Sequence, residues 1–263
     1  MADFIAIAKR FEDRIDGVEY YETRATTRLK DQLLQILSFE SRQLLFLVGR
    51  PGSGKSLFLS RLPALLPSYE VYSFNTPFFE PVDFIKRVVE RRGVKLEEYS
   101  LEEMIQKAME IYKKSDVIIT IDEAQLLSKE MIELIRILAD SKAFWFLLAM
   151  HEHESQKILH QPQFASRPHR ILRIEPLVED EIAEFIANEL AKSGGYSFEK
   201  HFSKRLVRYL YKMSGGNFRD LKKILNRMFL LMDCAVKGQK KAYQKPSKCL
   251  VTMAAIDGGL LGV

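Results

Sequence analysis

The stretch that decides the fold is LLFLVGRPGSGKSLFL, residues 44–59. Residues 44–48 are all apolar and predict a buried strand. Residues 49–56, GRPGSGKS, fit the phosphate-loop pattern G-x-x-x-x-G-K-[ST] at every fixed position, and the apolar residues 57–59 begin a helical pattern. The order strand, glycine loop, helix is the context in which this pattern binds nucleotide phosphates.

The residue types of this loop account for that chemistry. Glycines let backbone N–H groups turn inward, and the helix that follows presents its positive dipole end to the phosphates. Lys55 would reach the terminal phosphates, and Ser56 would place its hydroxyl on Mg²⁺. We therefore expect a nucleotide site made of Gly49, Arg50, Pro51, Gly52, Ser53, Gly54, Lys55, Ser56 and Leu57.

A second stretch, VIITIDEAQ at residues 117–125, predicts the remaining chemistry. Its apolar strand ends in two adjacent carboxylates, and ligands bind at the carboxyl edge of a parallel sheet. Asp122 would hold Mg²⁺ through water, while Glu123 would orient and polarise the attacking water. Alone, two acids after a strand are weak evidence; after a phosphate loop they indicate nucleotide hydrolysis.

Strand and helix patterns alternate up to Pro176, and beyond it the pattern is entirely helical. Alternation predicts an α/β fold, a parallel five-stranded sheet with helices on both faces, followed by a small C-terminal helical lid. The expected strands are 44–48, 70–74, 117–121, 144–150 and 171–174, and the expected lid helices are 178–192, 198–213 and 217–236. The expected domains are an N-terminal helix and lead-in (1–24), a nucleotide-binding domain (25–176), the lid (177–236), and a basic linker with a short apolar end (237–263).

The composition is that of a globular protein with a sizeable core, with 47% hydrophobic and 29% charged residues. It has no apolar run of the length that crosses a bilayer, so we expect no membrane insertion. The net charge is +5, but residues 200–248 carry 14 Lys and Arg against two acids, which leaves −7 for the rest. Such a segment would meet nucleic acid, an acidic partner or the triphosphate, or would simply be a solvated helical face.

Together these motifs resemble the AAA+ ATPases over residues 20–236. Within that superfamily the chain is similar to ATPases of the general secretion pathway A type and, less closely, to transposition ATPases of the Mu B type. The sequences DEAQ at 122–125 and SGGNFR at 214–219 carry this resemblance. It implies ATP and Mg²⁺ as cofactors, ATP hydrolysis, a homo-oligomer, and protein partners in a secretion, pilus or DNA-uptake machine. The alternative is an ATP-dependent DNA-binding protein of the transposition or helicase-loader type, with DNA on residues 200–248.

The resemblance also implies roles for four further residues. His151 falls at the sensor-1 position, where the family more often has Asn, Gln or Thr. Arg167 matches the arginine that reaches a neighbouring subunit's nucleotide, with Arg170 as the alternative. Arg219 matches the sensor-2 arginine of the lid. For each arginine the competing interpretation is an ordinary surface charge. A metal site formed by His151, His153 and His160 is a further, less favoured hypothesis. The two cysteines have no metal-ligand spacing and need not pair, so we expect a cytoplasmic protein. The resemblance to the secretion ATPases implies that partners would recruit it to the inner membrane.

Overall fold

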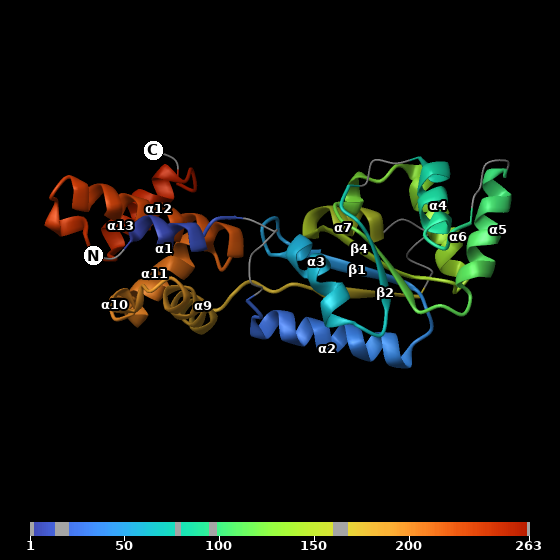
Figure 1. Cartoon of the computed structure of the whole chain (residues 1–263), viewed down its shortest axis with the longest axis horizontal. Coiled ribbons are helices and arrows are strands. Elements are labelled where there is room, and N and C mark those ends of the chain that lie inside the picture. Colours follow the sequence, from blue (N-terminus) through green and yellow to red (C-terminus); the bar gives the residue numbers. More distant parts are fainter. Residues whose placement is uncertain (1–2, 14–20, 77–79, 95–98, 160–167, 262–263) are drawn as a thin grey trace. The chain divides into compact units, whose positions relative to one another are not determined.

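The computed structural model describes residues 3–13, 21–76, 80–94, 99–159 and 168–261 (Figure 1). The chain folds as two compact units. One unit, here the α/β unit, comprises Thr26–Pro51 and Lys55–Ile174. The other, here the helical unit, comprises Met1–Ala25, Gly52–Gly54 and Glu175–Val263.

A parallel sheet of five strands forms the centre of the α/β unit, in the order β2-β3-β4-β1-β5. Every neighbouring pair is parallel, so the carboxyl ends of all the strands meet at one edge of the sheet. The three inner strands, β3, β4 and β1, are buried along their length except at His151, the last residue of β4, as unbroken apolar runs predict. The predicted five-stranded parallel sheet is therefore confirmed. Its strands are β1 (Leu44–Gly49), β2 (Glu70–Phe74), β3 (Val117–Ile121), β4 (Trp145–His151) and β5 (His169–Arg173).

Helices cover both faces of this sheet, as expected. Successive side chains of a strand point to opposite faces, so Leu45 and Leu47 pack with one set of helices while Phe46 and Val48 pack with the other. Figure 1 shows α2 on one side of the strands and α4, α5 and α6 on the other. The first set is α2 (Arg24–Phe39) and α3 (Lys55–Leu65); the second is α4 (Pro81–Glu90), α5 (Leu101–Tyr112), α6 (Lys129–Asp140) and α7 (Glu152–Leu159).

Local capping chemistry sets where these helices begin. Ser100 accepts a hydrogen bond from the backbone N–H of Glu103, and the Glu103 carboxylate accepts one from the backbone N–H of Ser100, which completes a capping box. Ser128 caps α6 with a single bond, in which its Oγ accepts from the backbone N–H of Met131 at 3.2 Å. The helix ends are less predictable. A proline near the start and Gly93 after the end predict a helix at 81–92, but the helix ends at Glu90, two residues early.

The helical unit has a core of its own, to which both ends of the chain contribute. The ring of Phe11 stacks on Phe229, with ring centroids 5.7 Å apart, and the last helix buries Leu250 and Val251. The segments expected outside the lid, 1–24 and 237–263, thus supply α1 and α13 to one hydrophobic cluster. The unit's helices are α1 (Phe4–Arg10), α9 (Glu179–Lys192), α10 (Tyr196–Glu199), α11 (Lys204–Ser214), α12 (Phe218–Lys237) and α13 (Lys248–Asp257).

Two helices differ from expectation here. The single helix predicted at 198–213 is two, because Ser203 has extended ψ (158°) and breaks the pattern between α10 and α11. The helical spacing of Phe4, Ile7, Phe11 and Ile15 predicts an N-terminal helix that runs past Phe11. The helix instead ends at Arg10, and the Phe11 ring stacks on Phe229. Within the described residues, no helix combines the length and the apolar character that crossing a membrane requires.

Candidate nucleotide-binding site

The phosphate loop leaves the end of β1 and enters α3 at Lys55. The Lys55 side chain is only 5% exposed. Its Nζ donates hydrogen bonds to the carbonyl oxygens of Gly49 and Arg50, each at 3.0 Å. The ammonium group is therefore held against the loop at the start of the helix. There, both the ammonium charge and the positive end of the helix dipole would attract a phosphate.

Two further features of the loop fit a bound phosphate chain. The Oγ of Ser53 is buried and has no hydrogen-bond partner among the described residues. A buried hydroxyl without a partner costs free energy unless a ligand supplies one. Gly54 has φ of +99°, a backbone conformation that side-chain-bearing residues rarely adopt. Ser56 and Leu57 lie in the first turn of α3, whose backbone N–H groups have no partners within the helix.

The predicted acidic pair lies at the same edge of the sheet. Asp122 follows β3 and is 8% exposed. Its backbone N–H donates to the Phe74 carbonyl at 3.0 Å, and its Oδ1 accepts from the Glu123 N–H at 2.9 Å. These contacts fix a buried carboxylate at the strand end, which suits the role of a Mg²⁺ ligand together with Ser56.

The Glu123 carboxylate is held by two neighbours. The amide Nε2 of Gln125 donates to Glu123 Oε2 at 2.5 Å, and Nε2 of His151 lies 3.5 Å from the same oxygen. His151 ends β4, opposite Gly49 of β1. The structure therefore brings Glu123 and His151, two of the predicted site residues, together at the carboxyl edge of the sheet. Gln125 belongs to the DEAQ motif, but the motif alone predicts no separate role for it.

Glu123 also has an unusual backbone, with φ 50° and ψ 38°. This left-handed conformation is uncommon for a residue other than glycine and costs about 1–2 kcal/mol. Strain of this kind is concentrated at functional sites, where surrounding contacts hold it. The turn begins the short helix η1 (Ala124–Leu126), which places the Gln125 amide beside the Glu123 carboxylate.

The structure places two of the three candidate arginines, and each of these two pairs with a carboxylate of the same chain. In the helical unit, Nε of Arg219 donates to Asp13 Oδ2 at 2.7 Å. Nε of Arg170 donates to the Glu40 carboxylate at 2.8 Å, so this arginine is already paired within its own chain. Arg167 lies outside the described residues, as does His160. Among the residues that are described, no group of three or more His, Cys, Asp and Glu is arranged to hold a metal ion.

The comparisons with known proteins bear on the fold. Residues 37–159 match a family model described as an AAA domain. Among solved structures the chain is similar to Cdc6p from Pyrobaculum aerophilum, at 16% identity and a TM-score of 0.63, covering 89% of this chain and 67% of that one. The chain has the P-loop AAA+ fold. Comparison with curated proteins gives no match.

Two further solved structures share the AAA+ fold with this chain. The ADP form of the Aeropyrum pernix ORC2 protein is 15% identical with a TM-score of 0.61, covering 95% of this chain and 72% of that one. The Thermotoga maritima RuvB Holliday junction branch migration motor is 17% identical with a TM-score of 0.56, covering 89% and 68%. The finer resemblance to the secretion-pathway and Mu B groups stays a prediction.

Proposed function

We propose that this chain is a Mg²⁺-dependent ATPase that binds ATP on its phosphate loop and hydrolyses it with Glu123 as the residue that orients water. The observation that carries the proposal is the arrangement around Glu123. Its carboxylate lies at the carboxyl edge of the sheet, is held by the Gln125 amide at 2.5 Å, and has His151 at 3.5 Å. A carboxylate held in this way at a strand end next to a phosphate loop is suited to positioning a nucleophile.

Phosphoryl transfer to water needs little covalent chemistry and much electrostatic positioning. Lys55 would exchange its two carbonyl partners for oxygens of the terminal phosphates. Ser56 and Asp122 would hold Mg²⁺, which when bound neutralises charge on the phosphates. Glu123 would orient the water, and His151 would contact the γ-phosphate as sensor 1. Arg219 would act as sensor 2 from the helical unit, the proposed lid, after leaving Asp13.

The test is the turnover of ATP by the Glu123→Gln variant beside the wild type. Glutamine keeps the size of the side chain but cannot polarise water as a carboxylate does, so we expect retained ATP binding and turnover at least about a hundredfold lower. Glu110→Gln, which changes an exposed acid on α5, is the matched control. Chelation of Mg²⁺ should abolish turnover in the wild type. Turnover of the Glu123→Gln variant at the wild-type rate would exclude Glu123 from the mechanism.

We propose further that the ATPase works as a homo-oligomer within a larger protein machine of the secretion, pilus or DNA-uptake type. The DEAQ and SGGNFR sequences support that assignment through their resemblance to secretion-pathway ATPases. Arg167 would act on a neighbouring subunit's nucleotide, a contribution worth about a thousandfold in related enzymes. Turnover per subunit should then rise with protein concentration in the wild type and not in Arg167→Ala. A rate per subunit independent of concentration would contradict this proposal.

A second candidate is an ATP-dependent DNA-binding protein, favoured by the basic segment 200–248. Part of that charge is neutralised within the helical unit: Arg208 pairs with Glu179 and Lys237 with Asp233. Lys222 is 4% exposed, and burial lowers its pKa. The remaining lysines are free to contact phosphates only if they are exposed, as Lys204 and Lys240 are. Stimulation of turnover by duplex DNA at low salt, lost in Lys204→Gln/Lys240→Gln, would favour this candidate.

A further inference from the structure

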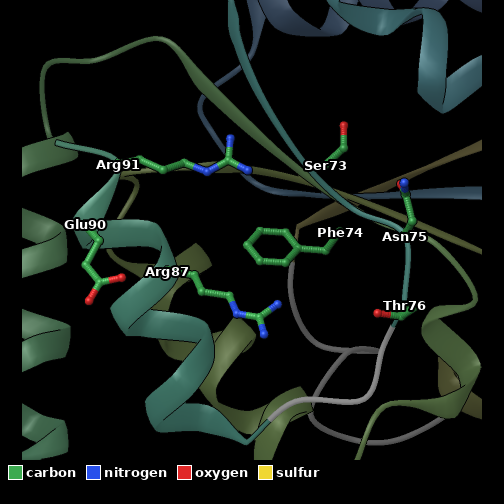
Figure 2. A pocket seen from close by; sticks show the side chains of 7 residues that line it. All are labelled: Ser73, Phe74, Asn75, Thr76, Arg87, Glu90 and Arg91. Atoms are coloured by element: carbon green, nitrogen blue, oxygen red, sulfur yellow. The ribbon is translucent and has the colours of Figure 1, made fainter. Parts of the chain in front are cut away.

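A pocket of about 440 Å³ lies in the α/β unit between the carboxyl end of β2 and the last turn of α4. Residues 73–76 line one side, and Arg87, Glu90 and Arg91 line the other (Figure 2). The nucleotide site does not use this pocket. β3 and β4 stand between β2 and β1 in the sheet, so three strand spacings, about 14 Å, separate the end of β2 from the strand that leads into the phosphate loop, although Asp122 follows the neighbouring strand β3.

The two arginines are placed to act together. They are four residues apart, so they share one face of the helical turn and lie about 6 Å apart along its axis. In Figure 2 both guanidinium groups extend toward the β2 side of the pocket, whereas the Glu90 carboxylate points away from them. Two guanidinium groups that line the same pocket offer several N–H donors to an anion with several acceptor oxygens.

Neighbouring rings hold Arg91 in position. Its guanidinium carbon lies 4.3 Å from the centre of the Tyr72 ring. The Tyr72 hydroxyl donates to Glu70 at 2.8 Å and accepts from Tyr112 at 3.2 Å, which fixes the ring. Stacking uses the face of the guanidinium and leaves the N–H groups along its edge available to a ligand. The cation is thus pre-organised before any ligand arrives.

Neither arginine of the pocket forms an ion pair within the described part of the chain, although Glu90 lies in the same pocket. Other arginines of this unit do find carboxylates: Arg92 pairs with Glu70, and Arg170 pairs with Glu40. The pocket therefore has two cations against one carboxylate that faces elsewhere. On the opposite wall, the Thr76 hydroxyl points toward the helix side and adds a neutral hydrogen-bonding group, whereas the Ser73 and Asn75 side chains point away from the arginines in Figure 2.

We propose that this pocket binds phosphate groups of a nucleic-acid backbone. Asn75, Thr76, Arg87 and Arg91 are all exposed, so the site is open enough for a strand to run across it. Phe74, at its base, is 6% exposed and presents little surface on which a base could stack. The contact is therefore with the backbone and independent of sequence. This inference goes beyond the proposed ATPase, since it does not require ATP, and it concerns a surface distinct from residues 200–248.

A ligand in this pocket would also lie next to the catalytic edge. The Phe74 carbonyl at the base of the pocket accepts the hydrogen bond from the backbone N–H of Asp122 at 3.0 Å. Movement of the β2 end on binding would thus reach the strand end that carries Asp122 and Glu123. Binding of an anion to the pocket does not require this hydrogen bond to transmit any movement.

The test measures binding of a labelled single-stranded oligonucleotide, and of a duplex of the same length, by fluorescence anisotropy without ATP. The salt concentration is raised from about 50 to about 200 mM. The variant is Arg87→Gln/Arg91→Gln. Its control is Lys113→Gln/Lys114→Gln, which removes the same charge from exposed positions at the end of α5 in the same unit. Melting temperature and ATP affinity, which the pocket double variant should retain, show that each protein is folded.

Each phosphate contact contributes about 0.7 to the slope of log affinity against log salt for a single strand. The pocket double variant should therefore lower that slope by about 1.4 and weaken binding at low salt at least about tenfold, while the control leaves both unchanged. Equal slopes for the wild type and the pocket variant would overturn the proposal. So would a wild type that binds neither nucleic acid, or one whose bound strand is displaced equally well by polyglutamate at matched ionic strength. Failure of ATP hydrolysis alone would leave this inference standing.

Discussion

Because the backbone of Glu123 is strained, we predict that the Glu123→Gly variant has a larger free energy of unfolding than the Glu123→Ala variant. With φ of 50° and ψ of 38°, any residue with a Cβ costs about 1–2 kcal/mol there. Alanine keeps that cost and glycine removes it. Glycine loses about 0.5–1 kcal/mol through its greater freedom in the unfolded chain. Both variants lose the hydrogen bond to Gln125, so this term cancels, and Glu123→Gly should be more stable than Glu123→Ala by about 0.5–1 kcal/mol.

The chain offers a suitable probe and a matched control. Its single tryptophan, Trp145, lies in β4 and is 2% exposed, so its fluorescence reports unfolding of the α/β unit in urea. Glu133, exposed in the middle of α6, should show the opposite order, with alanine more stable than glycine by about 1 kcal/mol. If alanine were the more stable replacement at both positions, the left-handed turn at Glu123 would be refuted.

Three further predictions concern binding and stability. Lys55→Ala removes charge-assisted hydrogen bonds worth about 1.5–3 kcal/mol and should weaken ATP binding roughly 10- to 150-fold in a fluorescent-nucleotide titration; unchanged affinity would exclude this site. Phe11→Ala truncates a fully buried ring and should lower the free energy of unfolding of the helical unit by about 3–5 kcal/mol, followed by circular dichroism in urea; a loss below about 1 kcal/mol would place α1 outside the core. The backbone hydrogen bond from Ser100 lowers the pKa of Glu103, so the stabilisation from this carboxylate is complete above the ordinary glutamate pKa and is lost as pH falls through the lowered value. Glu103→Gln should therefore be less stable than the wild type at neutral pH and converge with it in acid; a constant difference across the acid range would contradict this.

Local patterns in the sequence were sufficient to predict most of the α/β unit. The strand at 70–74 is predicted at its observed position, and the sequence SLEE at 100–103 fits the capping-box pattern that Ser100 and Glu103 form, because apolar runs and capping boxes act over a few residues. The phosphate-loop motif at Lys55 has fixed spacing, so it can be recognised without the fold, whereas Asp122 is singled out only by its place after an apolar strand in a chain that carries that loop.

What the sequence did not predict depends on contacts between distant segments or on a single backbone angle. The hydrogen bond from Gln125 to Glu123 requires the left-handed turn, which no residue type in DEAQ specifies. The pocket at Arg87 and Arg91 requires the Tyr72 ring of β2 beneath α4. The place of α1 in the helical core rests on contacts such as the one from Asn226 to the Ala8 carbonyl, which are 218 residues apart.

That last contact has a consequence for how the protein is made. The helical unit takes its first helix from the start of the chain and its last from residues 248–257, with the whole α/β unit encoded between them. During synthesis α1 emerges before the α/β unit, yet the partners that bury Phe11, among them Phe229, emerge after that unit. The α/β unit can complete its sheet in the meantime, while the apolar face of α1 stays exposed to water or to a chaperone. A pause in translation between these points would prolong that exposure without altering a single residue of the finished protein.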